Sequence, residues 1–482
     1  MNLVRGTVGR NAPRVEINEK VTGRALYLAD LTRPGMLHGA ILASPYPHAR
    51  IQGYDTARAR ALPGVRAVVT GDDVGWHRMG AFIKDETALA KGKVRYVGEA
   101  VAAVAAVDEA TARAAAQLIE VRYEELPAVL TPDEALAEGA PVIHEELASY
   151  VKVFPAQCGG NLMSLTEMVE GDVAAGFAAA DVVVEGVFET QAQNHLALEP
   201  VGALAEVDAG GRVTLWSTNQ SVFRVQANVC ESLGLPMARL RSLTPRVGGG
   251  FGNKMEATVQ PVTALLALAA GRPVKLVLSR EEDFEMVRAR HPFRIRCKTG
   301  AKRDGTLIAR EVEVLADGGA YADDSPGVLG YALLMARGPY RIPHSRCCGR
   351  VAYTNKLRFG AFRGFGNPQV SFAGEQQIDE IAGKLGRDPL ELRLKNAMRH
   401  GDLWFGGQPV ASNGLIECIG KVRRASDWDA RRKRGRGAAS ASPAPPTSAG
   451  CSAPARLSAC SRTAASCSTP ARSTSVRAPT PC

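Results

Sequence analysis

The chain lacks any Cys-x-x-Cys pair, although it contains ten cysteines. Six lie in the first 430 residues and four lie beyond them, without the spacing of a zinc or iron–sulfur site. The ten are Cys158, Cys230, Cys297, Cys347, Cys348, Cys418, Cys451, Cys460, Cys467 and Cys482. Scattered cysteines in a long chain are typical of reduced, buried thiols, so we expect a cytoplasmic protein without a disulfide framework.

Long apolar runs are missing as well. Residues 1–23 are polar and contain Pro13, so they do not have the apolar core of a secretory signal. The most apolar stretch, near residues 263–270, is too short to cross a bilayer. With 45% hydrophobic and 22% charged residues, the 482-residue chain has the composition of a soluble globular protein of about two to four domains.

Acidic residues are absent from residue 431 onward, where nine of the 59 basic residues lie. The first 430 residues therefore carry 50 basic and 49 acidic residues and are almost neutral. The formal net charge of +10 comes from one end of the chain, so it does not indicate a nucleic-acid surface on the folded body.

Residues 437–482 also lack lysine and aromatic residues, and they contain only two larger aliphatic residues, Leu457 and Val476. Such a segment cannot bury enough apolar surface to offset its conformational entropy, so we expect it to be disordered. A natural linker rarely carries four cysteines, and the composition changes abruptly after residues 428–432. A shifted reading frame is our hypothesis, and the downstream nucleotide sequence tests it.

The rest of the chain predicts an α+β fold, because short β-rich runs alternate with amphipathic or alanine-rich helices. The expected strands are 37–42, 65–70, 94–104, 118–123, 181–188, 212–217 and 239–244. The expected helices are 108–117, 223–233, 257–270 and 369–385, the last ending before Gly386.

Two glycine-rich stretches stand out from this background. Residues 247–254 read Val-Gly-Gly-Gly-Phe-Gly-Asn-Lys, and residues 361–369 read Ala-Phe-Arg-Gly-Phe-Gly-Asn-Pro-Gln. Glycine permits positive φ and close approach to a ligand, and successive free N–H groups form an anion-binding concavity. With Lys254 in one loop and Arg363 in the other, the pattern indicates a large, phosphate-bearing cofactor.

The first loop alone is compatible with a dinucleotide-binding turn, with Glu281 or Glu282 as the ribose acid. Asn253 stands where the third glycine is expected, and Pro261 lies inside the following helix. A P-loop fits less well, because Met255 follows the lysine in place of Ser or Thr. A dinucleotide-binding oxidoreductase therefore remains an alternative.

His195 and Glu199 lie four residues apart, the spacing of two metal ligands on one helix face. Pro200 follows directly and no second histidine lies nearby. We expect a structural pair and no zinc site.

Taken together, several stretches are far more specific. They are 195–200 (His-Leu-Ala-Leu-Glu-Pro), 217–220 (Ser-Thr-Asn-Gln), the two glycine-rich stretches, and 388–396 (Asp-Pro-Leu-Glu-Leu-Arg-Leu-Lys-Asn), preceded by 21–23, 39–44, 48–50 and 97–101. In this order and spacing, the chain resembles the large, molybdopterin-binding subunit of the xanthine dehydrogenase/aldehyde oxidase family of molybdenum hydroxylases. The four N-terminal stretches resemble the hammerhead domain of this family.

The resemblance implies an N-terminal hammerhead α/β domain followed by a mixed α+β molybdopterin-binding domain. The expected regions are an arm (1–14), the hammerhead domain (15–129), a linker (130–149), the first molybdopterin-binding domain (150–405), the start of an incomplete second molybdopterin-binding domain (406–436) and the tail (437–482).

By this resemblance, Gln220 matches the glutamine that binds an oxygen ligand of molybdenum, and Arg363 matches the arginine beside the metal. Phe251, with Gly249, Gly250 and Gly252, matches the loop against the pterin and the metal's ligands. None of these residues is a direct side-chain ligand. Phe365 matches the aromatic that packs on a planar substrate. From the residues alone, structural roles stay open: Gln220 capping a strand, Arg363 pairing with Glu375 or Asp379, and Phe365 in the core.

Two positions bear on the substrate. In relatives that hydroxylate xanthine a glutamate follows the first loop and an arginine stands at a second position, where this chain has Met255 and Tyr331. A purine's polar edge would then be left unpaired, at a cost of a few kcal/mol. Gly364 replaces the cysteine of the CO-oxidising members. An aldehyde or an aromatic N-heterocycle remains the expected substrate.

The family's general-base glutamate lies in a Gln-Gly-x-Gly-Glu-like segment, and nothing similar follows Asn396. We therefore expect no catalytic residue in this chain. Because loss of the base should lower the rate by about 10² to 10⁴, we also expect little activity from this chain alone. The resemblance further implies the cytosine dinucleotide form of the cofactor, with iron–sulfur clusters and FAD on partner subunits. A polypeptide completing the site, or a non-catalytic remnant, are both open.

Overall fold

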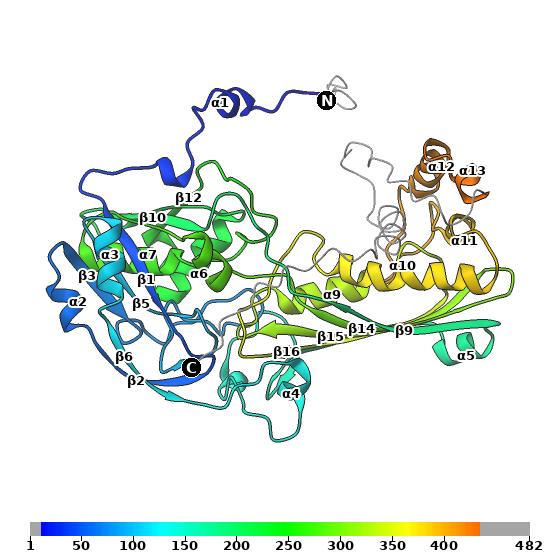
Figure 1. The fold of residues 1–482 in the computed structure, drawn as a ribbon, viewed down its shortest axis with the longest axis horizontal. Helices are drawn as coiled ribbons and strands as arrows, with labels where there is room; N and C mark the ends of the chain where they lie inside the picture. The colour runs from blue at the N-terminus through cyan, green and yellow to red at the C-terminus, as the bar shows by residue number, and fades with distance from the viewer. Residues whose placement is uncertain (1–10, 434–482) are drawn as a thin grey trace.

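The computed structural model describes residues 11–433. The expected N-terminal arm is thus described only from residue 11, and the expectations for residues 437–482 lie outside the described part. The α+β class is confirmed, because helices and sheets alternate along the described chain and build two main bodies side by side (Figure 1).

A seven-stranded sheet forms the centre of the first body, in the order β12-β11-β10-β13-β1-β5-β3. Its strands are β1 (Leu37–Ala43), β3 (Val65–Thr70), β5 (Ala100–Ala106), β10 (Gly202–Val207), β11 (Val213–Ser217), β12 (Leu240–Leu243) and β13 (Val274–Val277). β1 runs parallel to β13, with Leu37 opposite Val274. Two parts of the chain far apart in sequence therefore share one sheet.

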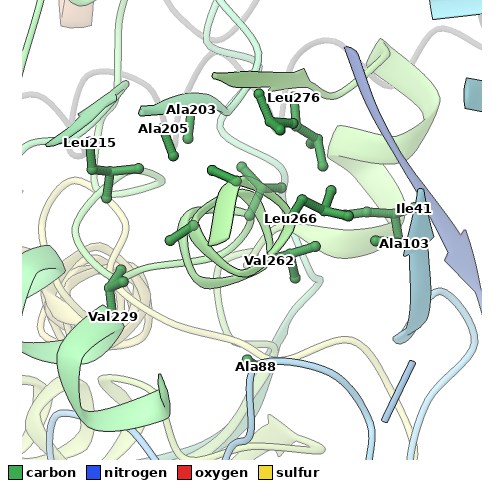
Figure 2. Packing of buried hydrophobic residues seen from close by; sticks show 14 of the residues in the cluster. Ile41, Ala88, Ala103, Ala203, Ala205, Leu215, Val229, Val262, Leu266 and Leu276 are labelled. Carbon is green, nitrogen blue, oxygen red and sulfur yellow. The ribbon is translucent and has the colours of Figure 1, made fainter. Parts of the chain in front are cut away.

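Helices pack on this sheet through small apolar residues. They are α2 (Ala57–Ala61), α3 (Glu109–Ala116), α6 (Val222–Leu233) and α7 (Gln260–Ala270). Figure 2 shows α7 almost end-on below Ala203 and Leu276 of the sheet, with Leu266 pointing toward Ile41 and Ala103. α7 ends at Gly271, whose φ of 60° is the usual left-handed cap.

A three-stranded sheet, β4-β2-β6, lies beside this body. It contains β2 (Ala49–Asp55), β4 (Lys93–Val94) and β6 (Glu120–Glu125). The expected single strand 94–104 is therefore wrong, because it is divided between β4 and β5. Gly98 turns the chain there with a φ of 100°, where a Cβ would lie 2.7 Å from the carbonyl oxygen of Glu285.

The second body is a six-stranded sheet in the order β7-β8-β16-β15-β14-β9. Its strands are β7 (Gln157–Gly159), β8 (Leu162–Glu170), β9 (Val182–Thr190), β14 (Phe293–Ala301), β15 (Leu307–Gly319) and β16 (His344–Tyr353). α9 (Ser325–Met335) and α10 (Asn367–Lys384) cover one face (Figure 1). The second glycine-rich stretch leads into α10 and includes its first turn.

Short helices complete the described chain. They are α1 (Ile17–Val21), α4 (Pro132–Leu136), α5 (Val173–Ala178), α8 (Arg280–Met286), α11 (Pro389–Asn396), α12 (Leu415–Ala425), α13 (Trp428–Lys433) and the 3-10 turns Leu28–Asp30, Leu147–Ser149 and Met237–Arg239. The last three α-helices pack together, and Trp428 Nε1 donates to Asp388 Oδ2 at 2.9 Å.

Two general findings concern the described residues only. Their six cysteines form no disulfide. Between residues 11 and 433, no helix has both the length and the apolar character needed to cross a membrane.

Candidate functional site

The two glycine-rich stretches lie against each other. We call residues 247–254, which lead from β12 toward α7, the first loop, and residues 361–369, which lead from β16 into α10, the second loop. The N–H of Arg363 donates to the carbonyl oxygen of Phe251 at 2.8 Å. Gly252 has a φ of 109°, and a Cβ there would lie 2.3 Å from the carbonyl oxygen of Ala361. Only glycine fits this contact, because both the conformation and the space exclude a side chain.

Gln220, three residues after β11, holds the first loop in shape. Its Oε1 accepts the N–H groups of Gly252 at 3.0 Å and Lys254 at 3.3 Å, and its own N–H donates to the Lys254 carbonyl at 2.8 Å. Two backbone donors require an acceptor, which fixes the orientation of the amide. Its Nε2 is left as a donor without a partner among the described residues.

More donors around Gln220 have no partner within residues 11–433. They are the N–H groups of Gly249, Gly250 and Phe251 and the guanidinium of Arg363. A Cβ on Gly250 would lie 2.3 Å from Gln220 Oε1, so glycine is needed for the close approach. Consecutive backbone donors, an amide and a guanidinium all favour negatively charged oxygen atoms.

Arg363 does not pair with Glu375 or Asp379, which was the open structural alternative. Both carboxylates bind Arg393, whose guanidinium lies 2.8 Å from each. Arg363 is exposed, in keeping with a cation that is free for a ligand.

Lys254 behaves differently from the expected phosphate-binding cation. Its Nζ lies 2.9 Å from Glu199 Oε2 and 2.8 Å from the Glu199 carbonyl oxygen, and the side chain is fully buried. Glu199 Oε2 also accepts the N–H of Gly248 at 2.7 Å. Burial lowers the pKa of Lys254, and the charge of Glu199 opposes this effect. Lys254 therefore fixes the first loop from behind.

His195 and Glu199 do not form the expected structural pair, because each binds a different loop. His195 Nε2 donates to the carbonyl oxygen of Ala361 at 2.8 Å, and its ring stacks on Phe362 at a centroid distance of 4.1 Å. Burial lowers the pKa of His195 to about 4, so the ring is neutral at neutral pH. Its buried Nδ1 has no partner in the described part of the chain.

Two arginines at the site were missed from the sequence. Arg290 lies 4.0 Å from the centre of the Phe362 ring and donates to the Arg363 carbonyl oxygen at 2.8 Å. Arg288 is fully buried, donates to Asp323 Oδ2 at 2.7 Å and binds the Asn253 carbonyl oxygen. Both lie just after α8, with no local motif, so only the folded chain reveals their partners.

Four bulky or charged residues around the loops have positive φ. They are Leu196 (50°), Phe251 (55°), Asp323 (43°) and Phe365 (48°), out of five such non-glycine residues within residues 11–433. Each costs of order 1–3 kcal/mol, and residues of this kind cluster at functional sites. The strain marks this region as more than a turn between elements.

The residues expected to face the substrate fall into two groups. Phe365 and Tyr331 of α9 form an edge-to-face pair, 6.2 Å between ring centres. Met255 follows the first loop and is half-buried. The part of the chain that is described contains no ring contact or hydrogen bond between Met255 and this aromatic pair. Phe365 also packs against the cluster of apolar residues under α9, so its core role is partly real.

Glu256, next to Met255, is not free to bind a ligand. Its carboxylate pairs with Arg224 at 2.5 Å and accepts from the Asn228 amide. Burial raises the pKa of Glu256 to about 8, and the nearby Asp323 and Asp324 add to the effect. The acid therefore belongs to a buried cluster.

The ribose acid of a dinucleotide site is not present at Glu282. This residue closes a capping box with Ser279 at the start of α8 and pairs with Arg113 at 2.9 Å. No cluster of three metal-ligating side chains occurs between residues 11 and 433.

Comparison with known families matches two parts of the chain. Residues 154–397 match the molybdopterin cofactor-binding domain, and residues 22–127 match the hammerhead domain of aldehyde oxidase and xanthine dehydrogenase.

Curated relatives cover most of the chain. A probable xanthine dehydrogenase subunit of Bacillus subtilis (strain 168) is 42% identical over 385 residues, which is 80% of this chain and 50% of the relative. The nicotinate dehydrogenase large molybdopterin subunit of Eubacterium barkeri is 38% identical over 418 residues, 86% of this chain and 95% of the relative.

Solved structures agree with this pattern. The aldehyde oxidoreductase of Desulfovibrio gigas has a TM-score of 0.82 and 34% identity, covering 88% of this chain and 47% of that one. The quinoline 2-oxidoreductase of Pseudomonas putida 86 has a TM-score of 0.80 and 32% identity, covering 88% and 55%. The chain thus spans about half the length of most of these proteins.

Proposed function

The chain belongs to the xanthine dehydrogenase/aldehyde oxidase family of molybdenum hydroxylase large subunits, and from this premise we propose that it supplies one wall of a molybdopterin-dependent oxidation site. The observation that carries the proposal is the set of unpartnered donors on the two touching glycine loops. The donors fit an anionic, oxygen-rich cofactor, whereas a metal ion alone would need acceptors.

In this role each residue has a separate task. Gln220 Nε2 and the N–H groups of Gly249, Gly250 and Phe251 would hold oxygen atoms of the cofactor, and Arg363 would balance negative charge. Gly252 keeps the two loops in contact. When bound, the molybdenum cofactor supplies oxygen transfer to a substrate carbon and takes up the two electrons. We propose its cytosine dinucleotide form.

We propose an aldehyde or an aromatic N-heterocycle as the substrate. The pair of Phe365 and Tyr331 offers an edge-to-face contact to a planar ring. Glu256 is held by Arg224 and cannot pair with the polar edge of a purine. Nicotinate and quinoline, named for two relatives, are aromatic N-heterocycles, and a third relative is an aldehyde oxidoreductase.

The general base and the remaining cofactor contacts would come from a second polypeptide. In support, the chain covers 95% of the Eubacterium barkeri large molybdopterin subunit but about half of other relatives. Several apolar side chains near the loops are exposed, as expected of a surface that another polypeptide covers: Leu196 (60%), Leu198 (90%), Phe223 (80%) and Phe251 (46%). We propose iron–sulfur and FAD subunits as further partners, in a cytoplasmic complex.

The test is molybdenum content after coexpression with whichever molybdopterin, iron–sulfur and flavin polypeptides its locus encodes. The decisive variant is Gln220→Glu, which keeps an acceptor for Gly252 and Lys254 but has no N–H to donate. We expect the wild-type complex to hold molybdenum and Q220E to lose most of it. Gln157→Glu, an exposed site on β7, is the matched control and should retain it.

Two outcomes separate the alternatives. A wild-type complex without molybdenum supports a non-catalytic remnant. An extracted nicotinamide or flavin dinucleotide, seen in an absorbance spectrum of the chain alone, supports a dinucleotide-binding protein.

A further inference from the structure

A buried polar network joins the region that matches the hammerhead domain to the region that matches the cofactor-binding domain. On the first side are Asp85, Glu86 and Glu99, and on the second are Tyr321, Ala322, Tyr353 and Arg358. Asp85 is 4% exposed, and its Oδ2 accepts the N–H of Ala322 at 2.8 Å and the hydroxyl of Tyr353 at 2.9 Å. Glu86 pairs with Arg358, and Glu99 accepts from Tyr321.

The partners of Asp85 lead directly to the aromatic side of the proposed site. Ala322 lies three residues before α9, and its carbonyl oxygen accepts the N–H of Ser325 at 2.8 Å. α9 carries Tyr331, which meets Phe365. Asp85 therefore holds the start of α9 through its hydrogen bond to the Ala322 N–H.

The same point is connected to the second loop. Ser325 Oγ donates to the carbonyl oxygen of Phe359 at 3.1 Å. The following Gly360 has no room for a side chain, because a Cβ would lie 2.5 Å from Asp323 Oδ1. A shift at residues 322–325 would therefore act directly on residues 359 and 360, which lead into Arg363 and Phe365.

The burial of the Asp85 carboxyl group costs free energy. Burial raises its pKa to about 7, and the structure provides no direct cationic partner for it in the described residues. A carboxyl group that is buried at this cost and accepts two hydrogen bonds from the other region fixes the position of that region.

We propose that Asp85 is a positioning residue of the oxidation site: through Ala322 and Tyr353 it sets the place of α9 and of the second loop, and so of the pair Tyr331 and Phe365. The effect on catalysis rests on the proposed function, whereas the effect of Asp85 on the position of α9 and the second loop does not. Asp85 is not among the residues that we assign to the cofactor or to the substrate.

Three variants test it. Asp85→Ala removes both hydrogen bonds, and Asp85→Asn keeps an amide oxygen that accepts them. Asp73→Ala is the control for the loss of the same two kinds of hydrogen bond at an exposed residue: Asp73 Oδ2 accepts one backbone N–H (Thr70, 2.7 Å) and one hydroxyl (Thr70, 3.0 Å), both within its own region.

The first measurement is hydrogen–deuterium exchange of the full chain without cofactor. We expect D85A to speed exchange about tenfold or more in peptides covering residues 325–335 and 361–369, with residues 202–217 unchanged. D85N should remain within about twofold of the wild type, and D73A should leave all three regions at wild-type rates. Equal exchange in D85A and D73A over residues 325–335 and 361–369 overturns the proposal.

The second measurement uses the molybdenum-loaded complex with benzaldehyde, which has both an aldehyde group and a planar ring. Per bound molybdenum, D85A should raise KM several-fold while kcat changes less, and D85N should restore KM. A D85A complex with wild-type KM per molybdenum contradicts the catalytic part. If the wild-type complex holds no molybdenum, the proposed function fails, and the exchange result still decides whether Asp85 positions α9.

Discussion

The contact between the two glycine loops leads to a quantitative prediction for Gly252→Ala. Gly252 has a φ of 109°, where an alanine is strained at a cost of about 1–3 kcal/mol. The new Cβ would also lie 2.3 Å from the oxygen and 2.6 Å from the carbon of the Ala361 carbonyl group. Both atoms are backbone, so one loop must move, at a further cost of about 1–3 kcal/mol.

The matched control is Gly271→Ala. Gly271 also has positive φ, 60°, but a Cβ there meets no atom within 4 Å. This variant therefore has the conformational cost alone, about 1–2 kcal/mol. The difference between the two variants contains the contact between the loops and the additional backbone strain at a φ of 109°.

The assay is urea unfolding of the full chain, followed by far-UV circular dichroism, together with molybdenum retention in the coexpressed complex. G252A should unfold at a lower urea concentration than G271A and should lose molybdenum, because displacement of the second loop breaks the bond from Arg363 to Phe251. If G252A unfolds at the same urea concentration as G271A and keeps its molybdenum, the two loops do not touch as described.

Three further outcomes follow from the buried charges and from the cofactor. Lys254→Met leaves the Glu199 carboxylate, whose side chain is 14% exposed, without its cation, and it should destabilise the chain by up to about 3–5 kcal/mol in urea unfolding. The double variant with Glu199→Leu should recover part of this. The pKa of Asp85 is raised from 3.8 to about 7, so the folded chain holds a proton that the unfolded chain releases, and its stability falls as pH rises between these values. Relative to D85N, the wild type should lose about 2 kcal/mol of unfolding free energy between about pH 5.5 and about pH 8, and a pH-independent difference contradicts a buried titrating carboxyl. Removal of the cofactor from the loaded complex should lower the melting temperature of the chain, and readdition should restore it.

Much of the fold was predictable because local signals agree with it. Helix 108–117 has an Asp108 N-cap, and α10 ends at Lys384, just before the Gly386 stop. The strand 94–104 is mispredicted because Gly98 lies within an otherwise continuous β-like run. Gly98 lies close to the backbone of Glu285, almost 190 positions away in the sequence, and no local pattern contains this contact.

The glycine loops were also recognisable, but the partners of the charged residues were not. Lys254 ends one glycine-rich stretch and Arg363 lies inside the other. Within residues 11–433, Lys254 pairs with a carboxylate and Arg363 does not. The difference arises because Glu199 folds back onto the first loop, and because Arg393 occupies the acids near Arg363. These ion pairs join side chains that are distant in the sequence, so they can be identified only in the folded chain.

Positive φ at Phe251 and Phe365 could not be predicted either. Sequence rules place glycine at such positions, and both loops contain glycines directly beside the phenylalanines. The surrounding hydrogen bonds hold this strained conformation in the folded chain, and no local sequence pattern contains them.

The shared seven-stranded sheet has a consequence for how the protein is made. β1 emerges from the ribosome roughly 240 residues before β13, the strand that pairs with its free edge. At ordinary rates of synthesis that edge stays open for roughly 10 to 50 s. An unpaired strand edge can pair with other chains, so the nascent protein is exposed to edge-to-edge aggregation until residue 277 has been made. For the same reason, a fragment ending between the two matched regions would keep an open edge permanently and should aggregate.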